Sequence, residues 1–415
     1  MNGLKELEGP GANHAPAANG APGCGRRFIF YANELIGLGQ LRRTLALAST
    51  LSAGKSSPSS LVITGSPVEP MFELPPRVDT VKLPGRSRDL NGRQHSARLA
   101  LDTDELRYLR SQIALASAAG FNPDVAVVDK LPLGQGGELR QTLEELRHNS
   151  DCKLVLGLRD IEDSQENVRR NWGPEMRAEI ERYYDAILVY GPASAPSAIT
   201  SAGFQFDIPV HHVGYVGTPV PESGPADLVS DYLLATAGGG FDGFRLLAAF
   251  AEALRLRPLP CPAVMVTGPL MSRPDRARLR GLTQGLDIQL FELRRDMEYV
   301  IAGAAGVVSM AGYNTVSELM RARKPALLVP RSGPSHEQRI RARALAEAGL
   351  QDMLDPAEIS PQSMRAALDR LLNRRGPEVL TEDWSGGTDR AASLLTNLAA
   401  APARRKPTAA CAQGA

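Results

Sequence analysis

The chain has 415 residues, of which 43% are hydrophobic, and its formal net charge is +1. This length is sufficient for two domains with full hydrophobic cores, and the balanced charge argues against broad electrostatic binding to nucleic acid. The four cysteines lie far apart and form no CxxC pair, which disfavours a disulfide framework and a cysteine-based metal site and favours a cytoplasmic location.

The first half of the chain alternates apolar strands with helices. Residues 1–26 are rich in Gly, Ala, Pro and Asn, and we expect a disordered leader there. Strands are predicted at 27–31, 61–65, 78–83, 123–129, 153–160 and 186–190, and helices at 41–53, 102–119, 139–149 and 175–184. Because the strands are apolar without a two-residue period, they indicate a parallel sheet covered on both faces. We assign this first domain to residues 27–205.

The same cycle restarts in the second half of the chain. A segment rich in Pro and Gly, residues 206–230, is predicted to link the domains. Strands follow at 232–237, 263–267, 288–292, 306–309 and 326–330, with helices at 244–254, 363–373 and 387–399. We therefore expect a second α/β domain at 231–375, a closing helix within 376–400 and a disordered tail at 401–415.

The most informative segment runs from Val307 to Met320 and reads as a buried strand, a glycine turn and a helix. In an open α/β sheet, ligands bind beyond the carboxyl ends of the strands, where helix N–H groups bind phosphate. Gly312, Asn314 and Thr315 would line such a turn. Glu318 would lie one helical turn further and accept hydrogen bonds from sugar hydroxyls. These residues predict a nucleotide-sugar site, although an ordinary capped helix with a solvated Glu318 explains them as well.

A glycine turn opens the second domain between its first strand and first helix. Gly238, Gly239 and Gly240 would let the backbone approach an anion closely and point consecutive N–H groups at it. A plain packing turn is an equally good explanation of the same residues.

Polar residues also follow the strand predicted at 326–330. Arg331 stands just past its end, and Glu337 and Gln338 begin the next helix, where they could equally be first-turn residues of an N-terminal cap. Their combination with Gly312 and Glu318 at adjacent turns favours one ligand site over separate caps.

In the first domain, a turn of the form Gly-x-Gly precedes the first helix. Gly37 and Gly39 form this turn, and Gln40 and Arg43 could face a cleft between the domains. The alternative is a glycine-rich turn followed by solvated arginines.

Charged residues end two neighbouring strands of the first domain. Asp129 ends one strand, and Arg159 and Asp160 end the next. Carboxylates at this edge are candidate general bases for an incoming hydroxyl. They could equally belong to a structural ion pair.

The sequence resembles a bacterial group of predicted glycosyltransferases related to MurG, the enzyme that adds GlcNAc to the peptidoglycan lipid precursor. The resemblance runs over about residues 27–375. It rests on Gly-Leu-Gly-x-Leu-Arg-Arg at 37–43, Val-Asp-Lys at 128–130, Gly-Leu-Arg-Asp-Ile at 157–161 and Ser-Met-Ala-Gly-Tyr-Asn-Thr-Val-Ser-Glu at 309–318. It implies a GT-B fold, in which two Rossmann-like, doubly wound α/β domains face each other across a cleft. The second domain would bind a UDP-sugar donor and the first an acceptor, which could be a glycan, a lipid-linked sugar or a small molecule.

Residue by residue, the resemblance assigns donor contacts to the second domain. Glu318 matches the acid that holds the donor ribose, and Gln338 matches a glutamine that contacts the donor sugar. Gly312 and Thr315 match the turn beside the diphosphate, and Gly238–Gly240 match the glycine turn that opens the domain.

One residue departs from the pattern. Relatives usually carry His after the Gly-x-Gly turn, and this chain has Gln40, which cannot take up a proton at neutral pH. A base role would then move to Asp129 or Asp160, or be lost.

We therefore expect an inverting hexosyltransferase that uses a UDP-sugar such as UDP-GlcNAc. The alternatives are a UDP-sugar 2-epimerase and a nucleotide-sugar-binding protein without catalysis. No metal ion or other cofactor is predicted, because no Asp-x-Asp pair lies in a suitable turn. The Arg-rich segment at 86–98 could contact a membrane surface peripherally or form a solvated loop.

Overall fold

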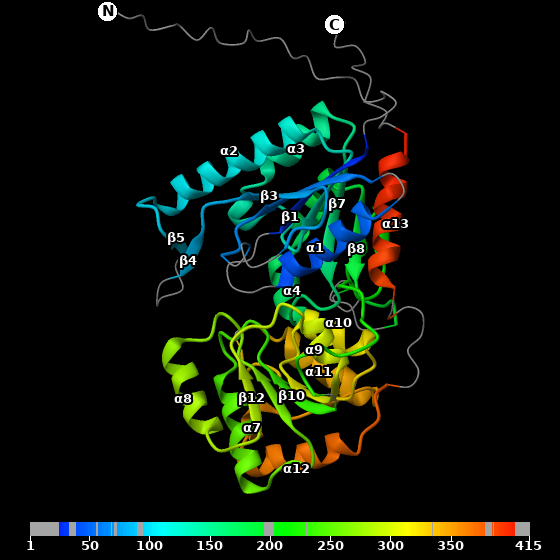
Figure 1. The fold of residues 1–415 in the computed structure, drawn as a ribbon. Coiled ribbons are helices and arrows are strands. Elements are labelled where there is room, and N and C mark those ends of the chain that lie inside the picture. The colour runs from blue at the N-terminus through cyan, green and yellow to red at the C-terminus, as the bar shows by residue number, and fades with distance from the viewer. Residues whose placement is uncertain are drawn as a thin grey trace, which may run out of the picture.

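The computed structural model describes residues 25–32, 39–54, 57–67, 69, 73–88, 94–194, 203–229, 231–333, 335–377, 384 and 386–402. They form two α/β domains stacked one above the other (Figure 1). Each domain is built on its own parallel sheet. The predicted fold class is therefore confirmed.

The first domain is built on a sheet of seven parallel strands in the order β3-β2-β1-β6-β7-β8-β9. These strands are β1 (Arg27–Ala32), β2 (Ser59–Thr64), β3 (Val78–Lys82), β6 (Val125–Asp129), β7 (Lys153–Arg159), β8 (Ala186–Tyr190) and β9 (Val210–His212). Every residue of β6 and β8 is buried, as expected for a sheet covered on both faces. The strand order reverses between β1 and β6, and ligands bind at such switch points.

Helices and one hairpin surround this sheet. The helices are α1 (Gly39–Ser52), α2 (Thr103–Phe121), α3 (Arg140–Asn149), α4 (Gln165–Asn171) and α5 (Pro174–Tyr183). The Arg-rich segment expected to be a loop contains two short antiparallel strands, β4 (Arg86–Arg88) and β5 (Gln94–Ser96). α2 begins with a capping box, in which Asp102 accepts from the N–H of Glu105 and the Glu105 carboxylate accepts from the N–H of Asp102.

The second domain is built on six parallel strands in the order β12-β11-β10-β13-β14-β15. These strands are β10 (Tyr232–Thr236), β11 (Ala263–Val266), β12 (Ile288–Phe291), β13 (Ala304–Ser309), β14 (Ala326–Leu328) and β15 (Asp352–Met353). Its helices are α7 (Phe244–Leu256), α8 (Arg273–Thr283), α9 (Met297–Ala302), α10 (Tyr313–Arg321), α11 (Glu337–Glu347) and α12 (Pro361–Leu372). The strand order reverses between β10 and β13. α9, α10 and α11 lie on the side that meets the first domain (Figure 1).

The chain crosses between the domains more than once. β9 pairs with β8, so the first sheet takes a strand from the segment expected to be a linker. The last helix, α13 (Gly387–Ala400), returns to the first domain and packs against α1 (Figure 1). A Cβ added to Gly387 would lie 2.3 Å from the carbonyl oxygen of Tyr215, so α13 begins in close contact with the segment after β9.

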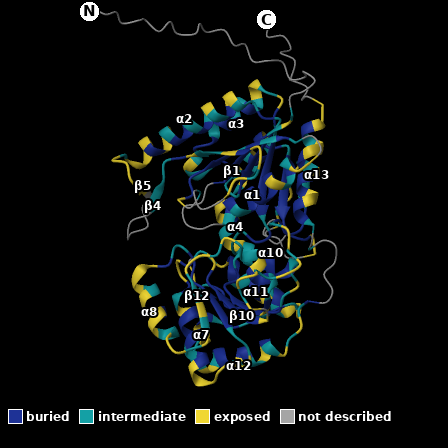
Figure 2. Cartoon of the chain, viewed as in Figure 1, coloured by how far each residue is buried: buried dark blue, intermediate teal, exposed yellow. Residues whose placement is uncertain are grey.

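The buried hydrophobic residues form three clusters, one of which spans both domains. The central strands of the two sheets are buried, and the outer helices expose one face each (Figure 2). One hydrophobic cluster joins Tyr190 of the first domain, Tyr215 of the connecting segment and Tyr313 of the second domain. Within the described residues, none of the helices has the length and apolar character that crossing a membrane requires.

Candidate functional site

The switch points of the two sheets face each other. In the second domain, Gly238–Gly240 follow β10, and Gly312 precedes α10 after β13. In the first domain, α1 follows β1, and Asp129 ends β6. The side-chain amide of Asn314, at the start of α10, donates to the carbonyl of Gly39 at 3.0 Å. The predicted phosphate turn therefore lies against the opening turn of the first domain.

Within the part of the chain that the structure describes, the start of α10 has no side-chain cap and adjoins the other predicted donor residues. No side chain among the described residues caps this helix, so its first N–H groups are available to an anion. A Cβ added to Gly238 would lie 4.0 Å from Thr315 Oγ1, and one added to Gly312 would lie 3.8 Å from Gln338 Nε2. The fold brings these four residues together at one helix N-terminus.

The glycines after β10, Gly238 and Gly240, differ in what surrounds them. Gly238 and Gly240 have φ angles of +60° and +94°, which favour glycine. A Cβ at Gly240 would lie 2.3 Å from the carbonyl oxygen of Thr267, so packing between two turns explains this residue. Gly238 instead opens toward α10. Packing therefore accounts for Gly240, and the anion-binding role of Gly238 stays a prediction.

We expect Gly240→Ala to lower the free energy of unfolding by about 2 kcal/mol or more, because the methyl group meets backbone and the φ angle is unfavourable. Gly239→Ala is the matched control, since its Cβ would meet only Leu270 Cδ1 at an ordinary 3.6 Å. Chemical denaturation of both variants measures the difference. Equal losses in the two variants would contradict this account of the turn.

Arg331 and Gln338 are joined by a hydrogen bond beside this turn. The side-chain oxygen of buried Gln338 accepts from the backbone N–H of Arg331 at 3.1 Å. The guanidinium Nε of Arg331 lies 3.3 Å from a carboxylate oxygen of Asp242, which follows the glycine turn. Because the Arg331 side chain is one-third exposed, its charge remains accessible at the edge of the site.

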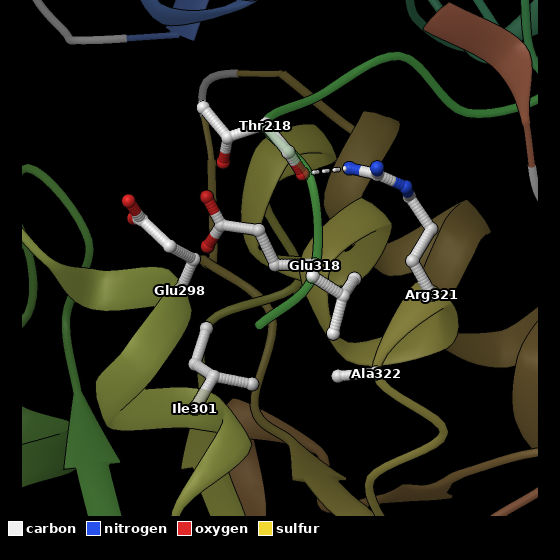
Figure 3. Close-up of a pocket in the computed structure, with 7 residues that line it drawn as sticks. Thr218, Glu298, Ile301, Glu318, Arg321 and Ala322 are labelled. Carbon is white, nitrogen blue, oxygen red and sulfur yellow. Dashed lines mark hydrogen bonds between the residues drawn. The ribbon is translucent and has the colours of Figure 1, made fainter. Parts of the chain in front are cut away.

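Glu318 lies one helical turn beyond Thr315 and lines a small pocket (Figure 3). The carboxylates of Glu318 and Glu298 lie side by side there, and Arg321 donates to the carbonyl of Thr218 at 2.6 Å. The pocket is lined by Thr218, Val220, Glu298, Ile301, Glu318, Arg321 and Ala322.

The charge state of Glu318 depends on a residue of the first domain. Glu318 is 8% exposed, and burial raises the pKa of its carboxyl group. Arg42, on α1, lies 2.7 Å from the carboxylate and lowers this pKa in part, whereas Glu298 raises it. Arg42 is therefore the nearest counterion of Glu318 in this structure.

Asp129 is engaged in a buried ion pair. Arg43 donates to both of its carboxylate oxygens, at 2.8 Å and 2.6 Å. The guanidinium carbon of Arg43 also lies 4.9 Å from the ring centroids of Tyr190 and Tyr313. Burial raises the pKa of Asp129, and Arg43 offsets this effect in part. Neither Asp129 nor Arg43, which is 2% exposed, is directed to solvent or an acceptor here.

Asp160 is held from the second domain. Arg341 of α11 donates to its two carboxylate oxygens at 2.8 Å and 2.6 Å, and Tyr215 donates to one of them at 3.3 Å. Arg341 also donates to the carbonyl of Ala311 at 2.9 Å, just before Gly312. The side chains of Asp160 and Arg341 are 3% and 1% exposed, so this ion pair across the domain junction is dry.

Arg159 makes a second charged contact across the junction. It pairs with Glu337 of α11 and, at 2.9 Å, with Glu162 of its own domain. Burial alone would raise the pKa of Glu337, but the guanidinium groups of Arg159 and Arg341 outweigh it and lower this pKa. Glu337 is therefore ionised and already has a partner.

Several residues of the junction were not predicted from the sequence. Arg42, Tyr215 and Arg341 reach the site only because the two domains pack in this orientation. Gln40 is 4% exposed, and its side-chain oxygen has no hydrogen-bond partner among the described residues. Gly37, predicted beside it, lies outside the described residues.

Comparison with known proteins identifies the second domain. Residues 239–381 match the glycosyltransferase family 28 C-terminal domain. The second domain is therefore similar to the C-terminal domain of family 28 glycosyltransferases. The chain is also 31% identical over 209 residues to the UDP-N-acetylglucosamine--N-acetylmuramyl-(pentapeptide) pyrophosphoryl-undecaprenol N-acetylglucosamine transferase of Brucella canis, covering 46% of this chain and 54% of that protein. The chain thus spans about half the length of the curated relatives that it matches.

Solved structures resemble both domains of the chain and the way in which they are arranged. CalG4, the calicheamicin glycosyltransferase, matches with a TM-score of 0.60 and 18% identity over 91% of this chain and all of that one. MurG of Acinetobacter baumannii matches with a TM-score of 0.56 and 15% identity over 90% of this chain and 99% of that one. UGT71G1 of Medicago truncatula, complexed with UDP-glucose, matches with a TM-score of 0.56 and 12% identity over 90% and 98%. The GT-B fold and the resemblance to MurG-related proteins are confirmed.

Proposed function

We propose that the chain is a glycosyltransferase that moves a hexosyl group from a UDP-sugar, such as UDP-GlcNAc, to an acceptor hydroxyl. The observation that carries this proposal is the uncapped start of α10 with Glu318 one turn further along, inside a domain similar to that of family 28 glycosyltransferases. The Brucella relative is named for the transfer of N-acetylglucosamine, and the Medicago neighbour holds UDP-glucose. Both names support a nucleotide-sugar donor, and a cytoplasmic location is part of the proposal.

The second domain would bind the donor through groups that the fold already assembles. The diphosphate would accept hydrogen bonds from the first N–H groups of α10, beside Gly238 and Thr315. The ribose hydroxyls would donate to Glu318, and the hexose would contact Gln338. Arg331 would lie near the diphosphate and favour the charge that grows on it.

Transfer would invert the anomeric carbon in a single displacement. The acceptor oxygen forms a bond to that carbon while the bond from the carbon to the diphosphate oxygen breaks, and UDP leaves. The acceptor proton must pass to a base. Asp129 and Asp160 remain the proposed bases, although each is engaged by an arginine in this structure.

A second candidate function follows from the same ion pairs. Gln40 cannot accept a proton at neutral pH, and the two candidate base carboxylates, Asp129 and Asp160, have arginine partners. These observations favour a nucleotide-sugar-binding protein without turnover as the alternative.

In the transferase, the acceptor, whether a glycan, a lipid-linked sugar or a small molecule, would bind on the first-domain side near Gly39 and Arg159.

Thermal unfolding in the presence of nucleotides tests the donor site. A ligand that binds only the folded state at a hundredfold excess over its Kd stabilises it by about 2.7 kcal/mol, which is about 3 °C or more in the midpoint for a chain of this size. We expect this shift with UDP and UDP-sugars and a smaller one with ADP.

Turnover is measured separately as UDP release from a UDP-sugar with candidate acceptors. Release that depends on an acceptor supports transfer, whereas binding without release supports the second candidate. No shift with any nucleotide would contradict the donor site.

A further inference from the structure

Arg42 is an arginine of the first domain that faces two carboxylates of the second. Its guanidinium Nη2 lies 2.7 Å from a carboxylate oxygen of Glu318 and 3.8 Å from one of Glu298. The Arg42 side chain is 21% exposed and the Glu318 side chain 10%. An arginine therefore occupies the position next to the proposed ribose acid.

The helices that carry these residues run alongside each other from their first turns. Asn314 contacts Gly39 at 3.0 Å, and Glu318 contacts Arg42. These pairs are four residues apart on α10 and three apart on α1, which is about one turn, or ~5 Å, on each helix. The guanidinium of Arg42 thus lies about one turn from the uncapped N–H groups of α10, where the donor diphosphate is proposed to bind.

When the donor binds, Glu318 and Arg42 can exchange partners so that neither charge is left without one. The buried carboxylate of Glu318 needs hydrogen-bond donors or a counterion, and two ribose hydroxyls supply donors. Arg42 would then be left beside Glu298 alone, close to a diphosphate that carries more negative charge. A guanidinium binds phosphate through paired N–H groups, and its long side chain spans the distance.

We propose that Arg42 pairs with Glu318 in the absence of the donor and binds the diphosphate when the donor is present. This inference rests on the proposed donor site. When ribose engages Glu318, Arg42 moves to the diphosphate and supplies a positive charge from the first domain. Donor binding is thereby coupled to contact between the domains, and the same charge stabilises the UDP leaving group.

Titration calorimetry of the full chain with uridine and with UDP tests this inference, because only UDP carries the diphosphate. In Arg42→Gln we expect the affinity for UDP to fall by about tenfold, the size of one charge-assisted hydrogen bond. The affinity for uridine should stay the same or rise, because Arg42 no longer competes for Glu318. The ratio of the two affinities therefore falls at least about tenfold.

Two further variants make the result specific. Arg107→Gln removes one charge from an exposed pair on α2 of the same domain and should leave the ratio unchanged. Arg42→Lys keeps the charge without the paired N–H groups and should lie between the wild type and Arg42→Gln.

Three outcomes would overturn the inference. If Arg42→Gln binds both ligands more tightly, with an unchanged ratio, Arg42 only blocks the pocket. If it binds both more weakly by the same factor, Arg42 only orients Glu318. If the wild-type chain binds neither uridine nor UDP, the donor site itself is wrong, and the role of Arg42 fails with it.

Discussion

Glu318→Gln should weaken UDP binding by about tenfold to a hundredfold while the chain stays folded. The carboxylate would accept hydrogen bonds from the ribose hydroxyls, and a bond to a charged group contributes ~1.5–3 kcal/mol. The amide keeps the shape of the side chain and removes its charge. Calorimetry with UDP measures the loss, and under turnover conditions the Michaelis constant for the donor should rise.

Glu298→Gln is the matched control for this prediction. Glu298 lines the same pocket from α9, and its carboxylate lies beside that of Glu318 (Figure 3). Its substitution should change UDP affinity by less than about threefold, because only Glu318 is assigned to the ribose. Equal losses in the two variants would show that pocket charge in general, and not Glu318 in particular, favours the ligand.

The pH dependence of UDP binding gives an independent check. Burial raises the pKa of Glu318 above that of an ordinary glutamate. Acidification therefore protonates it at a higher pH, and UDP affinity should begin to fall while exposed glutamates are still ionised. With uridine, which carries no phosphate to protonate, this decline should be absent from Glu318→Gln.

The sheets and the strand, turn and helix around Gly312 were predictable because their signals are local. Apolar runs without a two-residue period indicate buried parallel strands, and Gly312 followed by Asn314 and Thr315 indicates a strand, a turn and a helix. To predict that Gly238 lies near Thr315, one must also infer that β10 and β13 are neighbours at the switch point. This step follows from ordinary doubly wound topology.

The partners of the carboxylates were not predictable, because each partner is distant in the sequence and two of the three pairs cross the domain junction. For Asp129 the sequence left open a base or an ion pair, and the structure supplies Arg43, which is 86 residues away in the chain. For Asp160 the partner is Arg341, which is 181 residues away and on the other domain. Arg42 reads as a solvated residue in the sequence, and only the packing of α1 against α10 brings it to Glu318.

Asp160→Asn is expected to destabilise the folded chain by about 3–5 kcal/mol. Removing one partner of a buried pair leaves the other charge uncompensated, and both side chains here are almost fully buried. The buried guanidinium of Arg341 would lose its carboxylate partner and keep its contacts with Tyr313 and with backbone carbonyls and its electrostatic attraction to Glu337. Chemical and thermal denaturation measure the loss.

Asp352→Asn provides the control. Asp352 pairs with Arg374 at 2.6 Å, the same length as the shorter contact of Asp160, but both side chains are about one-quarter exposed. Its loss should cost less than about 1 kcal/mol. A similar cost for both variants would contradict the view that burial makes the Asp160–Arg341 pair critical.

The double variant Asp160→Asn, Arg341→Met separates a structural role of Asp160 from a catalytic one. Replacing both partners removes the uncompensated charge, so the double variant should be more stable than Asp160→Asn alone. If Asp160 only joins the domains, UDP release should recover together with stability. If stability recovers and UDP release stays at least about a hundredfold below that of the wild type, Asp160 acts as the base, since general base catalysis contributes ~10²–10⁴-fold. The ion pair with Arg341 would then have to open during each turnover.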